Sequence, residues 1–254
     1  MATTRPAVII VSASFSKPDF YRPLAEQLEQ TYGYETYVAT LQSPARTWPA
    51  QPATHLEDVA YIRAMIETLA AQGKEIVLFG HSYGGIPMTM SIHGLSREDR
   101  KKEGKTGGVI RLVYLTCPIP KPGESLAGMM SQGKEAFTYA EGEYLHLHVE
   151  KAAPVVFSDL SEETALEMTR MMPPQSVASF NGPISYPDFK DIALAWIFCE
   201  QDKLCTPESQ RESIANIEKE SGKTVSVFPI NSGHCPNVSQ PEAFLEHLHK
   251  AIQS

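Results

Sequence analysis

The stretch at residues 76–85, Ile-Val-Leu-Phe-Gly-His-Ser-Tyr-Gly-Gly, limits what this chain can fold into more than any other. Its first four residues are all apolar, which is typical of a strand buried on both faces of a sheet. Gly80 and Gly84 flank Ser82, and a helix is predicted over 86–95. This order predicts a strand, a tight turn with a serine at its tip, and a helix. Glycines are expected there because a Cβ would collide with the neighbouring strand and helix.

Strands and helices alternate on both sides of this turn. Strands are predicted over 7–13, 34–40, 76–79, 109–116, 192–199 and 224–229, and the main helices over 19–30, 54–73, 206–220 and 241–252. Between 41 and 53 the chain has three prolines and no periodicity, so this segment is predicted to be a loop. Strands separated by helices of this length imply a parallel sheet with right-handed crossovers. We therefore predict an α/β fold with six mostly parallel strands flanked by helices.

The region from about 120 to 191 lacks this alternation. It holds a predicted helix over 161–172 and several methionines, at 129, 130, 168, 171 and 172. We predict that it forms a small cap inserted after the fourth core strand, with these methionines in its core and some of them lining an apolar pocket. The core would then comprise residues 1–119 and 192–254 of a single domain spanning 1–254.

Composition narrows the choice of partners and compartment. The net charge of −8 argues against nucleic acid and anionic membranes, because both require a basic face. No apolar run approaches the roughly 18 residues that a membrane span needs. The four cysteines form no Cys-x-x-Cys pair, which favours free thiols and a cytoplasmic location. Whether the chain forms a homodimer is left open.

Three side chains with complementary chemistry follow predicted strands. Ser82 follows the third strand, Asp202 the fifth and His234 the sixth, and ligands of open parallel sheets bind beyond these strand ends. A serine hydroxyl is a poor nucleophile, so a histidine must take its proton, and a carboxylate must orient that histidine. The sequence predicts Ser82, His234 and Asp202 in these roles, with Glu200 as the alternative acid.

Two backbone N–H groups are needed to bind the oxyanion that such a serine would create. One is predicted to be that of Tyr83, directly after the serine. The other is expected in the loop after the first strand, where Ser14 is preferred and Ala13 is the alternative. Residues predicted to line the substrate pocket are Phe15, Met129, Met130 and Cys235.

Three other histidines have plainer explanations. His81 is interpreted as a residue that packs near the turn, since neighbours on a tight turn point apart. His146 and His148 share one face of a predicted strand, but no third metal ligand is evident beside them. We therefore expect neither a metal nor a cofactor.

Together these motifs resemble a known family. Gly-His-Ser-Tyr-Gly-Gly at 80–85, Phe-Cys-Glu-Gln-Asp-Lys at 198–203 and Gly-His at 233–234 resemble the compact α/β-hydrolases. That group includes plant methylesterases, hydroxynitrile lyases and esterase-like fungal and bacterial members. The resemblance covers essentially the whole chain. It implies a catalytic triad of Ser82, Asp202 and His234. It also implies an oxyanion hole with Ser14 and Tyr83 as the donors.

Two departures from the family pattern bear on the reaction. Relatives carry a His-Gly pair after the first strand, where this chain has Ser12 and Ala13, so the oxyanion loop is expected to differ in shape. Lyase members place a lysine directly after the catalytic histidine, where this chain has Cys235. We therefore predict a serine hydrolase that cleaves a small to medium apolar carboxylic ester or lactone through an acyl-enzyme. The alternatives are a lyase, cyclase or isomerase that uses the same site, and a non-catalytic ligand receptor.

Overall fold

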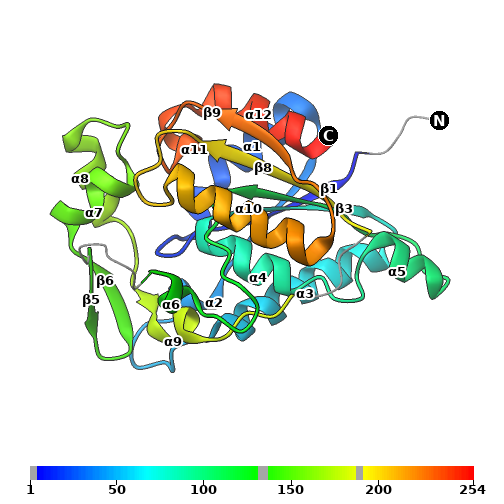
Figure 1. Ribbon diagram of the computed structural model, residues 1–254, viewed down its shortest axis with the longest axis horizontal. Helices are drawn as coiled ribbons and strands as arrows, with labels where there is room; N and C mark the ends of the chain where they lie inside the picture. Colours follow the sequence, from blue (N-terminus) through cyan, green and yellow to red (C-terminus); the bar gives the residue numbers. More distant parts are fainter. Residues whose placement is uncertain (1–4, 131–136, 187–190) are drawn as a thin grey trace.

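The computed structural model describes residues 5–130, 137–186 and 191–254, and a six-stranded sheet forms its centre (Figure 1). Every strand pair in this sheet is parallel. The strand order is β2-β1-β3-β4-β8-β9. The strands span Ala7–Val11 (β1), Glu35–Ala39 (β2), Glu75–His81 (β3), Gly108–Leu115 (β4), Ala193–Cys199 (β8) and Ser226–Ile230 (β9). The predicted parallel α/β sheet is confirmed.

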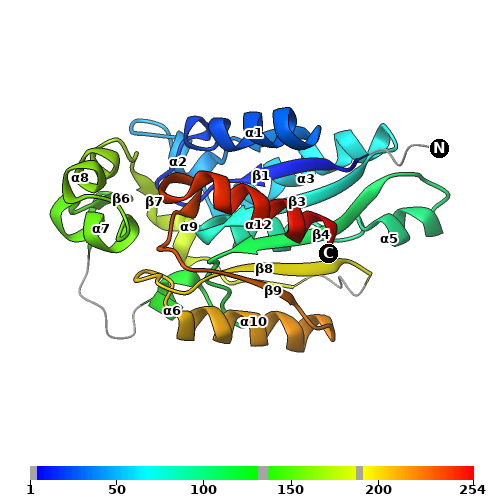
Figure 2. The same ribbon diagram turned by 90° about the horizontal axis from the view of Figure 1, so that it is seen from above.

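Helices cover both faces of the sheet (Figures 1 and 2). Helices α1 (Arg22–Tyr32) and α12 (Pro241–Gln253) pack on one face against Val8 and Ile10. Helices α3 (His55–Ala71), α4 (Gly85–Met90) and α10 (Pro207–Ser221) pack on the other, against Ile9 and Val11. These four residues of β1 are fully buried because successive side chains of a strand point to opposite faces, and here both faces are covered.

Some predicted element boundaries move for local reasons. Helix α1 begins after a short 3-10 turn, η1 (Pro18–Phe20), rather than at residue 19, and the predicted loop over 41–53 contains a short helix, α2 (Gln42–Ala45). Helix α4 ends at Met90 instead of 95, where the Ser91 hydroxyl donates to the Met88 carbonyl at 2.8 Å. Helix α3 begins with a capping box that Thr54 forms with Glu57.

Between β4 and β8 the chain builds the predicted cap. It contains a small antiparallel sheet, in the order β5-β6-β7, whose strands span Thr138–Glu141, Tyr144–Leu147 and Gln175–Ser176. Its helices are α6 (Leu126–Met130), α7 (Val149–Val156), α8 (Glu162–Arg170) and α9 (Val177–Asn181). In Figure 1 the arrowheads of β8 and β9 point toward α7 and α8, so the cap lies at the carboxyl end of the sheet.

Two methionines lie outside the cap core that the sequence predicts for them. Met130 is 40% exposed, although it lines the cavity described below. Met171 is 72% exposed because it follows the last turn of α8 and points away from the packed face. Met168 and Met172 do pack against the cap cluster around Phe157 and Cys235. Two further short helices complete the described chain, α5 (Arg97–Lys102) and α11 (Pro236–Ser239). Among the described residues, no helix is both long and apolar enough to cross a membrane.

Candidate active site

Ser82 lies at the tip of the turn between β3 and α4, in a 3-10 turn labelled η2 (Ser82–Gly84). Its φ of 52° is a left-handed conformation that non-glycine residues rarely adopt. A Cβ on Gly84 would lie 2.5 Å from the Ser12 carbonyl oxygen, and one on Gly80 would lie 2.9 Å from the Met88 sulfur. Close packing against β1 and α4 therefore explains both glycines and holds the serine in its strained conformation.

The imidazole of His234 is hydrogen-bonded to the carboxylate of Asp202. His234 Nδ1 lies 2.7 Å from Asp202 Oδ2, and both side chains are buried. The other carboxylate oxygen accepts from the backbone amides of Leu204 at 2.8 Å and Cys205 at 3.0 Å. Because Nδ1 carries the proton that faces the carboxylate, Nε2 is left as the basic nitrogen. Glu200, the alternative acid, is exposed and forms no such contact with His234.

Ser82 and His234 line one cavity of about 680 Å³. Ser82 comes from the end of β3 and His234 from the loop after β9, so the fold brings together two segments far apart in the sequence. No hydrogen bond between described residues joins the Ser82 hydroxyl to His234 Nε2. Such contacts are often long in ligand-free sites and shorten once substrate binds.

The loop after β1 supplies one amide that has no partner among the described residues. Ala13 N–H donates to the Tyr21 hydroxyl at 3.0 Å, and Phe15 N–H donates to Gln175 Oε1 at 3.1 Å. Between them, Ser14 N–H donates to no acceptor among the described residues and lines the cavity. Tyr83 N–H precedes the first i to i−3 bond of η2, so it too lacks a helical acceptor. Of the two amides weighed in this loop, that of Ala13 is already occupied.

His81 does more than pack beside the turn. Its Nε2 donates to the His234 carbonyl at 2.9 Å, because a carbonyl can only accept, and its Nδ1 therefore accepts from the Tyr21 hydroxyl at 2.7 Å. Burial, together with the nearby His234 imidazole, holds the pKa of His81 well below 6.5, so the ring stays neutral. A continuous chain of hydrogen bonds thus runs from Ala13 through Tyr21 and His81 to the loop that carries His234.

A buried carboxylate holds the Tyr83 side chain from the opposite side. Asp58, on α3, accepts from the Tyr83 hydroxyl at 2.7 Å and from the Ser43 hydroxyl at 2.5 Å. Two further bonds come from the backbone amides of Gln42 and Ser43. Burial raises the pKa of Asp58, and these hydrogen bonds oppose that shift. Burial and the neighbouring Asp58 raise the pKa of Tyr83 well above 10.0.

The wall of the cavity is mostly apolar. Among its lining residues are Phe15, Met129, Met130 and Cys235, the four predicted for the pocket. Burial raises the pKa of the Cys235 thiol well above 9.0, so the group is a neutral, apolar wall. All four cysteines of the chain are buried thiols that form no disulfide among the described residues. A wall of this kind suits an apolar ligand.

The cap also contacts the loop that carries His234. Asp159, between α7 and α8, accepts from Gly233 N–H at 2.8 Å and from the Ser239 hydroxyl at 2.6 Å. A Cβ on Gly233 would lie 2.7 Å from Asp159 Oδ1, so only glycine allows this approach. The cap therefore fixes the backbone directly before His234.

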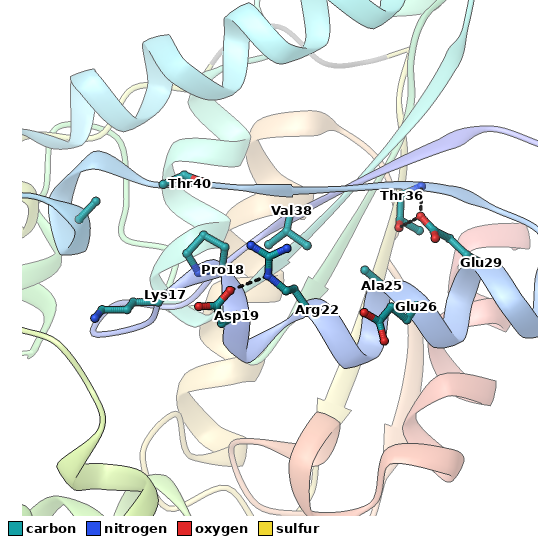
Figure 3. A pocket seen from close by; sticks show the side chains of 11 residues that line it. Lys17, Pro18, Asp19, Arg22, Ala25, Glu26, Glu29, Thr36, Val38 and Thr40 are labelled. Carbon is teal, nitrogen blue, oxygen red and sulfur yellow. Dashed lines mark hydrogen bonds and ion pairs between the residues drawn. The ribbon is translucent and has the colours of Figure 1, made fainter.

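A second hollow, of about 540 Å³, lies between α1 and β2 (Figure 3). Two of its charged groups pair with each other, Arg22 with Asp19 at 2.5 Å, and Glu29 accepts from the Thr36 hydroxyl. It contains none of the predicted site residues. The chemistry of the chain is therefore concentrated in the cavity at Ser82.

His146 and His148 lie on the β5–β6 hairpin and at its end, beside the ring of Tyr139. The nearest acid to His146 is Glu141, whose carboxylate is 3.9 Å away. Across the residues that the structure describes, no group of three or more metal-binding side chains occurs. Aromatic stacking therefore accounts for this pair.

Comparison with known proteins decides the family. A family model described as "Alpha/beta hydrolase family" matches residues 8–247. The chain belongs to the alpha/beta hydrolase family. It is 36% identical over 241 residues to "Probable hydrolase R7" of Phoma sp., covering 94% of this chain and 95% of the relative. As an alpha/beta hydrolase with a relative so named, the chain is a hydrolase by type.

Solved structures share the fold over nearly the whole chain. A pyrethroid hydrolase from Sphingobium faniae JZ-2 has a TM-score of 0.73 at 20% identity, covering 99% of this chain and 98% of that one. The methylesterase MES16 from Arabidopsis has a TM-score of 0.70 at 14% identity, covering 98% and 99%. These structures share the fold, and the predicted membership of the alpha/beta hydrolase family is confirmed by the family model.

Sequence reasoning missed Tyr21, Asp159 and Gln175, and it assigned His81 only a packing role. Gln175, Asp159 and His81 each bond to the backbone of a distant segment, and Gln175 and its partner Phe15 are 160 residues apart. Tyr21 joins Ala13, 8 residues away, to His81, 60 residues away. No local motif marks such contacts. The one available signal was the presence of polar residues in segments that are otherwise expected to be buried.

Proposed function

We propose that this alpha/beta hydrolase is a serine esterase that cleaves a small to medium apolar carboxylic ester or lactone through an acyl-enzyme. The observation that carries the proposal is the hydrogen bond between Asp202 and His234 beside a cavity that Ser82 also lines. A cavity of about 680 Å³ is within the usual range for sites that bind small molecules.

In the proposed reaction His234 Nε2 takes the proton of the Ser82 hydroxyl as Oγ attacks the ester carbonyl. Asp202 holds the Nδ1 proton and stabilises the imidazolium that forms. The amides of Ser14 and Tyr83 donate to the developing oxyanion. His234 then protonates the leaving alcohol, and a water activated by the same nitrogen releases the acid.

The residue after His234 favours hydrolysis over cyanohydrin cleavage. The family's lyases carry a lysine at this position, whereas Cys235 is buried and its raised pKa keeps it uncharged. No cation is therefore available at this position to stabilise a departing cyanide. Four buried cysteines without a disulfide among the described residues also support a reducing, cytoplasmic place of action.

The test is to trap the acyl-enzyme. A serine-directed phosphonate should label Ser82, and Ser82→Ala should lower kcat on a short p-nitrophenyl ester by about 10⁴-fold or more. Ser209→Ala, which removes another serine hydroxyl from the cavity wall, should retain labelling. Unchanged turnover in Ser82→Ala would end the proposal. A product that takes up no ¹⁸O from labelled water would point instead to a lyase, cyclase or isomerase.

A further inference from the structure

Gln175 is a cap residue that reaches into the core. It lies on β7, whose partner in the cap sheet is β6, and its side chain is fully buried. Its terminal amide offers one acceptor oxygen and one nitrogen with two donor hydrogens. A buried amide of this kind is costly unless each of these groups finds a partner. The partners it finds are therefore informative.

The amide oxygen of Gln175 accepts from Phe15 N–H at 3.1 Å. Because Phe15 N–H can only donate, this contact identifies the atom as the oxygen. Phe15 directly follows Ser14, and its φ of 54° is a left-handed conformation that a bulky residue rarely adopts. The Gln175 oxygen thus fixes the strained residue next to the Ser14 amide.

The amide nitrogen of Gln175 is equally occupied. It donates to the Ser43 hydroxyl at 2.8 Å and to the Ser179 hydroxyl at 2.7 Å. Ser43 in turn donates to Asp58, which also accepts from the Tyr83 hydroxyl. The Gln175 side chain is therefore bonded to Phe15, which directly follows Ser14. Through Ser43 and Asp58 it is also linked to the side chain of Tyr83.

We propose that Gln175 is a positioning residue for the oxyanion hole, through which the cap sets the distance between the Ser14 and Tyr83 amides. This inference rests on the proposed esterase function. Oxyanion stabilisation depends on donors held at about 2.7–3.1 Å from the oxygen, and a displacement of about 1 Å can cost 100-fold in rate. Removing Gln175 would release Phe15 and loosen Ser43 without touching Ser82, His234 or Asp202.

Gln175→Met tests this with little change in side-chain volume. With p-nitrophenyl butyrate as the probe, we expect kcat to fall 10- to 100-fold and KM to change less than 3-fold, because the oxyanion exists only after attack. Binding of an alkylboronic acid, which forms a tetrahedral adduct on the serine, should weaken by a similar factor. The matched control is Ser176→Ala in the same short strand, since the buried Ser176 hydroxyl has no partner among the described residues.

Counting active sites separates positioning from folding. The end point of phosphonate labelling gives the concentration of competent Ser82, so a folding defect lowers the end point while a positioning defect lowers kcat per labelled site. A kcat per site within 2-fold of the wild type, or unchanged boronate affinity, would overturn the inference. A wild-type enzyme that neither hydrolyses the ester nor is labelled would instead reject the esterase proposal and this inference with it.

Tyr83→Phe provides a second route if Gln175→Met does not fold. It removes the hydroxyl that bonds Asp58, at the other end of the same network, and leaves the Tyr83 amide in place. We expect the same kcat-specific loss, reduced to about 3- to 10-fold because the Phe15 contact survives. A kcat per labelled site equal to that of the wild type would contradict the proposed network.

Discussion

Tyr21→Phe removes one oxygen from the junction of three segments that build the site. The hydroxyl is fully buried, accepts from Ala13 N–H at 3.0 Å and donates to His81 Nδ1 at 2.7 Å. The phenyl ring left behind keeps its contacts with the rings of Phe20 and His81. The substitution therefore isolates the effect of two hydrogen bonds.

The expected loss of stability follows from the two groups left behind. A buried donor or acceptor without a partner costs about 1–3 kcal/mol, so two of them would cost about 2–6 kcal/mol. Ala13 and His81 both line the cavity, where water can replace part of the lost bonding. We therefore expect a decrease of about 2–3 kcal/mol in the free energy of unfolding. For a chain of this size that corresponds to a Tm lower by about 4–12 °C.

The same change should also slow turnover. Without the Tyr21 hydroxyl, the Ala13 amide next to Ser14 loses its acceptor. The His81 ring, which donates to the His234 carbonyl, also loses the hydrogen bond that orients it. We expect kcat on a p-nitrophenyl ester to fall by about 10-fold, since donors and base must remain within a fraction of an ångström.

Urea unfolding and ester hydrolysis measure the two effects, and Tyr34→Phe is the matched control. Tyr34 also bonds a histidine, with its hydroxyl 3.0 Å from His249 Nδ1, but the contact is only partly buried and lies away from the cavity. That variant should lose about 1 kcal/mol or less and keep its kcat. If Tyr21→Phe were as mild as Tyr34→Phe in both assays, the hydrogen-bond chain through His81 would have no energetic role.

Two further outcomes follow from the site. Asp159→Ala leaves Gly233 N–H without its acceptor and should lower kcat about 10-fold on the same ester. The control Asp99→Ala, which removes a partly exposed carboxylate on α5, should keep the wild-type kcat, and equal rates for the two variants would contradict the anchoring of the His234 loop by the cap. Burial lowers the pKa of His81 in the folded protein. Below about pH 6.5 the unfolded chain therefore binds a proton that the folded chain does not. As the pH falls further, the free energy of unfolding should decrease by up to about 1.4 kcal/mol per pH unit. In urea titrations from pH 8 to 5, His81→Gln should flatten this slope, and parallel curves for the two proteins would refute the assignment.

Much of the architecture could be predicted because its signals are local. The apolar run at 76–79 indicates a buried strand, and apolar residues repeated at helical spacing indicate the buried face of α3. Gly80 and Gly84 mark the close approach of backbone to backbone at the turn. Chain order along a parallel sheet also places Ser82, Asp202 and His234 at one edge, since parallel strands all end there.

The choices between neighbouring residues required tertiary structure. Asp202 and Glu200 are two residues apart, and only the turn after β8 points the first toward His234 and leaves the second exposed. Ala13 and Ser14 are adjacent, and only the position of Tyr21 decides which amide is occupied. In a loop, neighbouring residues can point their side chains or amides in opposite directions. The residue types along the chain do not indicate which direction each one takes.

The sequence by itself determined the parallel α/β sheet, the tight turn with Ser82 at its tip and the segments that carry the candidate site. Only the tertiary structure decided how those segments are held, through His81, Asp159 and Gln175. The physical reason is that burial repeats with the period of a helix or strand and is visible along the chain. A buried side chain that bonds the backbone of a distant loop has no period, and its partner is defined only once the chain has folded.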